Sequence, residues 1–228
     1  MNTANLAKLG GATLAAAIAL AANPVAAQEA GDIQVRLMAT AVLPDGNITD
    51  VLVDPGLPAG TQTVASDNVV PTVAIDYYFT PNVSVETICC VTQHDVDINA
   101  GALAGAEAVA NARVIPATFT LKYHMNPGGV SPYVGAGPTY FLWINDAPGA
   151  GTVAVLGATR QHLSNELGFA LQAGVDVPVG DNFMVSLDAK RYFVGTTASW
   201  YNASDTLVLQ TEHDIDPWVL SAGVGIRF

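Results

Sequence analysis

The chain is poor in three kinds of feature, and each shortage excludes a class of protein. Only eight of its 228 residues are Lys or Arg, against 20 Asp or Glu, which gives a net charge of −12. A nucleic-acid-binding surface needs a basic face, so no nucleic-acid partner is expected. The two cysteines, Cys89 and Cys90, are adjacent, which argues against a disulfide framework and against a zinc site with spaced ligands. After residue 27 no 18 consecutive residues are apolar, so a bundle of membrane-spanning helices is excluded.

The first 27 residues differ from the rest of the chain. Lys8 is their one charged residue, residues 9–22 form an apolar run, and Val25-Ala26-Ala27 supplies small residues before a cut after Ala27. This is the pattern of a secretory signal peptide. An N-terminal anchor is the weaker interpretation, because a spanning helix needs about 20 apolar residues. We therefore expect residues 28–228 to form one exported domain, whose net charge is −13 once Lys8 is lost.

Apolar residues make up half of the chain and are spread over short segments that alternate with polar residues. Such alternation predicts β-strands with two different faces, and it occurs at 32–41, 72–79, 83–91, 115–124, 133–143, 166–176, 183–190 and 218–228. In 133–143 both faces are apolar, so the direction of its faces stays open. The Ala-rich stretch 97–112 predicts a short helix, whereas the apolar stretches 51–53, 153–156 and 207–209 predict extensions of strands.

The connections between these segments alternate in length. Short links at 80–82, 126–130 and 178–181 contain Pro, Gly, Asn and Asp, which are typical of tight turns. The links at about 43–66, 93–112, 144–165 and 195–215 are long. Short turns at one end and long loops at the other are typical of bacterial outer-membrane barrels.

The same alternation also fits a soluble barrel with its apolar face inside, so the direction of the faces has to be argued. The polar faces carry four basic and five acidic residues, a near balance that favours mutual pairing inside a narrow lumen. We expect a charge plug there, made of Arg36, Asp76, Glu86, Lys122, Glu166, Asp176, Asp188, Lys190 and Arg227.

The C-terminal strand favours the same orientation. The chain ends in Phe228, and a final strand that ends in an aromatic residue is what outer-membrane barrels present to their barrel-assembly machinery. Aromatic residues near strand ends are expected to form interfacial girdles; they are Tyr77, Phe79, Tyr123, Tyr133, Trp143 and Trp218. The sequence thus predicts an all-β, eight-stranded antiparallel transmembrane barrel, with short periplasmic turns and long extracellular loops, among the outer-membrane lipids of a Gram-negative bacterium.

Several stretches also resemble the OmpW family of outer-membrane proteins, and the resemblance covers nearly all of residues 28–228. They are VIPATFTLKYHMNP (114–127), SPYVGAGPTYF (131–141), LGFALQAGVDVPVGDNF (167–183), SLDAKRY (186–192) and, most specifically, DIDPWVLSAGVGIRF (214–228). The resemblance implies passage of small hydrophobic solutes, which enter at the loops, follow an apolar upper cavity and leave sideways into the bilayer. The chain departs from the family at Cys89-Cys90, where small apolar residues and a proline are expected.

Physical reasoning adds candidate residues to this picture. Side chains fill the interior of an eight-stranded barrel, so the charge plug leaves no open water channel. An apolar solute is stabilised by burial at roughly 25 cal/mol per Å² and prefers an apolar cavity above the plug. Candidates for its lining, which ordinary packing or lipid contact would explain equally, are Met38, Val42, Ile88, Tyr140, Leu142 and Trp143.

The prolines within strands are candidates for the exit. Pro116 and Pro138 each remove a ladder hydrogen bond. We predict that they flank a lateral exit, the alternative being a local bulge with no transport role.

Two rival functions remain open at this stage. One is a structural or adhesion barrel with surface-exposed acidic loops, which a lumen packed to its top would favour. The other is a lipid-modifying enzyme, for which a loop-borne Ser-His-Asp cluster would be needed. The residues concerned are His94, Asp95, His162, Ser164 and His213, and their spacing assigns none of them such a role. We therefore expect no enzyme, no catalytic or metal-binding residues and no cofactor.

Overall fold

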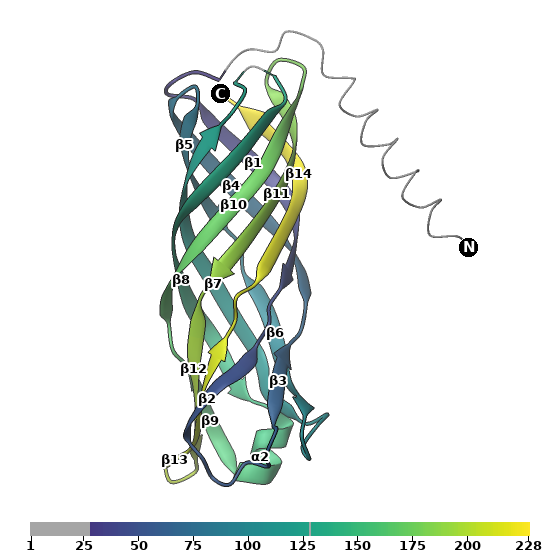
Figure 1. Cartoon of the computed structure of the whole chain (residues 1–228), viewed down its shortest axis with the longest axis vertical. Coiled ribbons are helices and arrows are strands. Elements are labelled where there is room, and N and C mark those ends of the chain that lie inside the picture. Colours follow the sequence, from purple (N-terminus) through teal and green to yellow (C-terminus); the bar gives the residue numbers. More distant parts are fainter. Residues whose placement is uncertain (1–27, 128) are drawn as a thin grey trace, which may run out of the picture.

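The computed structural model describes residues 28–127 and 129–228, so the predicted signal peptide lies outside the described residues. Eight antiparallel strands form a closed barrel (Figure 1), which confirms the predicted architecture. Pairing runs from β7 through β5, β4, β1, β14, β11, β10 and β8, and the β7–β8 ladder closes the ring. The eight barrel strands are β1 (Ile33–Leu43), β4 (Asn68–Thr80), β5 (Val83–Cys89), β7 (Glu107–His124), β8 (Ser131–Pro148), β10 (Glu166–Val179), β11 (Phe183–Phe193) and β14 (Trp218–Arg227).

Alternation along each strand produces an apolar outer wall and a polar lumen. On β4, Val73, Ile75 and Tyr77 are exposed, whereas Asp76 and Tyr78 between and beside them are fully buried. An exposed apolar outer face is what a barrel in a membrane requires. Of the aromatic residues predicted for the girdles, four lie on the outer face; they are Tyr77, Phe79, Tyr123 and Trp218.

Tyr133 corrects the girdle prediction. Its side chain is 1% exposed and points into the lumen, because β8 carries apolar residues on both faces and the sequence alone does not fix their direction. Trp143, on the same strand, is half-buried.

The two ends of the barrel differ, as the link lengths predict. Tight turns join β4 to β5 and β10 to β11 at the end that holds the C-terminus. At the other end the chain continues in strands beyond the barrel: β2 (Asn47–Val53), β3 (Gln62–Ala65), β6 (Thr92–Ala100), β9 (Ala158–Leu163), β12 (Gly195–Asn202) and β13 (Leu207–Asp214). Sheet β2-β13-β12-β9 and the β3–β6–β7 pairing together form this extension.

One helix is present among the described residues, and it is not the predicted one. Residues 97–112 end β6, turn and begin β7, because their main chain pairs across this hairpin. The helix is α2 (Ala150–Leu156), so 153–156 does not extend a strand, whereas 51–53 and 207–209 do lie in strands, as predicted. Gly157 ends α2 in a left-handed conformation with φ of 62°, which glycine adopts without steric cost. Within residues 28–127 and 129–228, no helix has the length and apolar character to span a membrane.

Candidate functional site

Seven of the nine charged residues predicted for the plug meet in the lumen. Each is at most 5% exposed: Arg36, Asp76, Glu86, Lys122, Asp176, Asp188 and Lys190. Glu86 is central, since its carboxylate lies 3.0 Å from Lys122 Nζ and 2.9 Å from Lys190 Nζ and also contacts the Arg36 guanidinium. A buried charge is tolerated when it is paired and hydrogen-bonded, and all three cations meet at least two carboxylates. With every group ionised, three cations and four carboxylates leave one net negative charge.

Neutral side chains complete the plug. Tyr133 accepts a hydrogen bond from Arg36 at 2.9 Å and donates one to Asp188 at 2.7 Å, and Lys122 Nζ lies 3.8 Å from the centre of its ring. Gln172 donates to Glu86 and Asp188. Sequence reasoning missed Tyr133 because the faces of β8 have no polar alternation, whereas Gln172 lies on a face that the alternation already marks as polar.

The other two charged residues lie away from the plug. Glu166 is half-buried at the loop end of β10 and accepts a hydrogen bond from Ser164. It precedes Asp176 by ten residues, which is roughly 33 Å along a strand, so its place in the predicted plug is wrong. Arg227 is near the opposite end, 3.5 Å from Asp32, and borders a small pocket that also touches Asp176.

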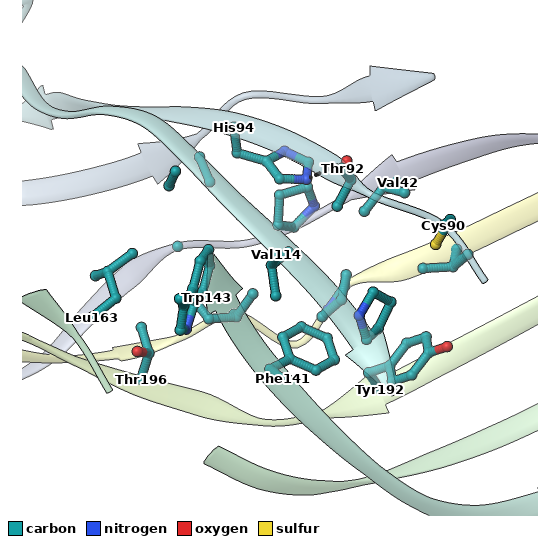
Figure 2. A pocket seen from close by; sticks show the side chains of 18 of the residues that line it. Val42, Cys90, Thr92, His94, Val114, Phe141, Trp143, Leu163, Tyr192 and Thr196 are labelled. Atoms are coloured by element: carbon teal, nitrogen blue, oxygen red, sulfur yellow. Dashed lines mark hydrogen bonds between the residues drawn. The ribbon is translucent and has the colours of Figure 1, made fainter. Parts of the chain in front are cut away.

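Above the plug lies a cavity whose lining is almost entirely apolar. Met38, Val42, Ile88 and Trp143 line it, together with residues such as Val114, Phe141 and Tyr192 (Figure 2). Lys190 belongs to both the lining and the plug, so the cavity ends directly on the charged cluster.

Tyr140 and Leu142 correct the predicted lining. They are 42% and 38% exposed on the outer wall, and Phe141 between them, 4% exposed, takes the inward position. The reason is again that β8 is apolar on both faces. The sequence therefore does not show which of its alternate residues point inward, and the prediction chose the wrong set.

A second apolar cavity lies nearer the loops. Residues of α2 cover it, and Trp200, 2% exposed, donates a hydrogen bond from Nε1 to the Ala108 carbonyl at 3.3 Å. His213 borders both cavities. Trp143 packs against the two apolar clusters that surround them, so apolar surface continues from the loop end to the plug.

The barrel wall is interrupted beside the first cavity. Strands β5 and β6 follow one another along the same edge of β7. The β5–β7 ladder ends at Thr87↔Phe119, and the β6–β7 ladder begins at Thr92↔Val114. Between these points, within the described chain, residues 88–91 form no ladder pairs with residues 115–118, although 88–89 still pair with β4 and 115–118 with β8. Ile88, Cys90 and Pro116 belong to this stretch and all line the cavity, so the cavity reaches the weak part of the wall.

The two candidate prolines occupy different places. Pro116 is buried and is paired with Phe141 of β8, but on the side of β5 and β6 it forms no pair with a described residue, and it has no N–H to donate. Pro138 is exposed on the outer face of β8 and is paired with Phe169 of β10. A side chain at neighbouring Gly137 would collide with the Phe119 carbonyl, so the strands are tight there. Among the described strands, residues 119–120 and 137–138 form no ladder pairs with each other, so the two prolines border different breaks in the pairing of β7.

The side chains considered for catalysis do not assemble. His94 bonds to Thr92 and the Ser66 carbonyl, His213 bonds to Thr211 and the Gly46 carbonyl, and His162 is exposed. Burial lowers the pKa of both His94 and His213, opposed by their bonds to backbone carbonyls. In the part of the chain that is described, no three His, Cys, Asp or Glu side chains gather as metal ligands.

A different Ser-His-Asp group lies buried in the lumen. Ser84 Oγ is 3.2 Å from Asp76 Oδ1 and 3.0 Å from His124 Nε2. The hydroxyl thus lies between the other two groups. In a catalytic triad the carboxylate orients the histidine, and that order is not present here.

Comparisons with known proteins agree on one family. The model of the OmpW family matches residues 29–228. The uncharacterized outer-membrane protein y4mB of Sinorhizobium fredii is 33% identical over 224 residues, covering 94% of this chain and 90% of that protein.

Solved structures share the fold. OprG of Pseudomonas aeruginosa superimposes with a TM-score of 0.75 at 24% identity, covering 90% of this chain and 99% of OprG. Outer membrane protein AlkL, determined in lipid bilayers, gives 0.71 at 20% identity, covering 90% and 94% of the two chains. Escherichia coli outer membrane protein W gives 0.53 at 23% identity, covering 88% and 100%.

Proposed function

The chain belongs to the OmpW family of Gram-negative outer-membrane barrels, and from this premise we propose that it is a channel for passive passage of small hydrophobic molecules across the outer membrane. One observation carries the proposal: an apolar cavity ends on a charged plug and reaches an unpaired part of the wall.

The plug determines which solutes can pass. Its carboxylates and cations are hydrogen-bonded to one another and almost fully buried, so an ion or polar solute would have to break these pairs to move down the lumen. An apolar solute gains from the cavity in proportion to the area it buries, and it gains nothing from the charged lumen below. In our proposal it therefore leaves through the wall.

The exit in this proposal is the stretch where residues 88–91 face residues 115–118. Missing ladder bonds lower the cost of separating two strands, and Pro116 cannot supply one. The stretch opens toward the hydrocarbon side, where Val91 is 48% exposed. Pro138 has no part in this exit.

Residues outside the site have roles in the same proposal. We infer that residues 1–27 direct export, and that the C-terminal strand β14 with Phe228 is presented to the barrel-assembly machinery. Phe228 is 67% exposed and exchanges two backbone hydrogen bonds with Ile33, so its ring lies on the lipid side at the barrel rim.

The test uses one apolar solute and one ion. Uptake of naphthalene, the apolar tracer, is measured in cells with and without the protein. Aqueous passage is measured as potassium conductance of the purified protein in planar bilayers. We expect faster protein-dependent uptake of naphthalene and no steady conductance. Unchanged naphthalene uptake would refute the proposal, and a large open conductance would refute the plug.

One observation favours a second function, that of a structural or adhesion barrel. The extracellular end is an ordered set of strands with exposed acidic residues such as Asp97, Glu212 and Asp214. Such a barrel needs no cavity above the plug. If naphthalene uptake does not depend on the protein, this function becomes the stronger one.

A further inference from the structure

We propose that the floor of the apolar cavity holds a hydrogen-bonding subsite centred on Thr72, which selects apolar chains that carry one neutral oxygen, such as medium-chain alcohols or ketones. The inference rests on the proposed channel function and specifies its solute. It begins with a buried hydroxyl that the cavity leaves with only a thiol as its partner.

Thr72 is 2% exposed and lines the cavity, and the hydrogen-bond partner of its Oγ1 among the described residues is the thiol of Cys90, which is a weak one. Other hydroxyls of the same lining are satisfied: Thr40 bonds to Ser221 at 2.9 Å, and Thr92 bonds to His94 at 2.8 Å. Buried hydroxyls are nearly always hydrogen-bonded to oxygen or nitrogen, so a hydroxyl with only a thiol beside it is poorly satisfied. A solute that carries an oxygen into the cavity supplies a stronger partner.

A donor with no partner among the described residues lies on the way to this floor. Trp143 Nε1 is buried without a partner among the described residues, and Trp143 lines the cavity from the side where the two apolar clusters meet. An indole N–H can only donate, so the solute atom that satisfies it must be an acceptor. A hydroxyl or carbonyl oxygen meets this condition at Trp143 and at Thr72.

The position of Thr72 places the solute oxygen beside the plug and the chain above it. Thr72 is paired in register with Met38, which also lines the cavity, and Lys190 and Tyr192 line the cavity as well. The remaining lining is almost entirely apolar. A chain that points its oxygen toward Thr72 therefore keeps its hydrocarbon part against apolar walls, where burial is favourable.

The charge of the plug decides between a neutral and an anionic head group. Its cations are already paired with four carboxylates, which exceed them by one. A carboxylate solute would lose its hydration, which is unfavourable, and Lys190, the plug cation that lines the cavity, is already paired with Glu86 and Asp188. The subsite therefore favours alcohols and ketones over fatty-acid anions.

The experiment measures protein-dependent uptake of three C8 solutes, 1-octanol, n-octane and octanoate at neutral pH, by cells that express the chain or Thr72→Val. Valine has the shape of threonine without the hydroxyl. We expect the protein to raise uptake of octanol and octane, octanol the more, and Thr72→Val to lower the octanol-to-octane ratio about fivefold, the effect of one hydrogen bond. Octanoate should gain least.

Thr40→Val is the matched control, because Thr40 lines the same cavity and its hydroxyl is already paired; it should leave the ratio unchanged. Heat-modifiable gel mobility verifies that each variant folds. If both solutes depend on the protein but Thr72→Val keeps the ratio, the subsite is refuted and the channel stands. If neither solute depends on the protein, the channel itself fails. A Thr72→Val protein that does not fold is replaced by Thr72→Ala, which also lacks the hydroxyl and must lower the ratio.

Discussion

Cys89 and Cys90 are neighbours in the sequence, yet they lie on opposite sides of the barrel wall. Cys89 is exposed on the outer face, whereas Cys90 is 8% exposed and lines the apolar cavity. Successive side chains of a strand point to opposite faces, and this pair stands where the ladder to β7 is interrupted. The chain thus has one thiol in the proposed pathway and one directly outside it.

The first prediction uses this pair. In a Cys89→Ala protein, a small apolar thiosulfonate that attaches a benzyl group to Cys90 should block naphthalene uptake by at least half, because the group occupies the cavity. Mass spectrometry gives the extent of labelling, and a reductant should restore uptake.

The matched control is Cys90→Ala, in which the same reagent labels Cys89 on the lipid side. Uptake should then stay within error of the unlabelled protein. Equal inhibition through either cysteine, or none through a fully labelled Cys90, would show that the cavity is not on the pathway.

The barrel itself could be predicted because its signals repeat along the chain. The alternation of apolar and polar residues, the balanced charges on the polar faces and the alternating link lengths can all be recognised in the local sequence. Together they specify the barrel strands, the turns and most of the plug. Tyr133, Tyr140 and Leu142 were misplaced for one physical reason: β8 has apolar residues on both faces, so its parity is decided by its neighbours.

Other features depend on pairing across distant strands and were not predictable. The interruption at residues 88–91 is visible only when β5, β6 and β7 are set in register. Residues 153–156 form a helix although their Val and Leu content favours a strand, and residues 107–112 pair in β7 although alanine favours a helix. In both cases tertiary contacts override weak local propensity.

The second prediction concerns the plug. Lys122→Met should lower the free energy of unfolding by about 3–5 kcal/mol, because it leaves Asp76 and Glu86 buried with fewer cations. Urea-induced unfolding in lipid vesicles, followed by tryptophan fluorescence, measures the change. Arg160→Met is the control, since its ion pair with Asp205 is exposed, and it should change stability little.

A double variant separates charge from packing. Adding Asp76→Asn to Lys122→Met removes one of the stranded carboxylates, so the double variant should be more stable than Lys122→Met alone. Additive destabilisation would mean that the ion pair between Lys122 and Asp76, at 2.8 Å, contributes nothing beyond packing.

The third prediction tests the lateral exit. The register on either side of the interruption sets Cys89 opposite Ala117, both on the outer face. In a Cys90→Ala background, Ala117→Cys should allow a disulfide to Cys89 that ties the two strands together. Oxidation should then lower naphthalene uptake severalfold, and reduction should restore it.

A disulfide elsewhere in the wall serves as the control for this staple. Ala39 and Ala222 are paired across β1 and β14 and both face outward, so Ala39→Cys with Ala222→Cys, in a chain whose natural cysteines are alanine, gives the same bond in an intact ladder. It should leave uptake unchanged. Full uptake through a protein with a completely formed Cys89 bridge would place the exit elsewhere.

The fourth prediction concerns pH and the extracellular strands. Burial lowers the pKa of His213 below its ordinary value of 6.5, although the Gly46 carbonyl bond opposes this shift. The folded protein therefore binds fewer protons than the unfolded chain, so the stabilising effect is complete above pH 6.5 and is lost as the pH falls below it. We expect β13 amides to exchange faster with deuterium, after correction for intrinsic rates, at pH 5 than at pH 7.5. His213→Gln should remove most of this pH dependence on β13. The control is His162→Gln, at an exposed position, which should retain it. If pH-dependent exchange persists in His213→Gln, the effect belongs to another group, and His94 on β6 is the first candidate because burial lowers its pKa too.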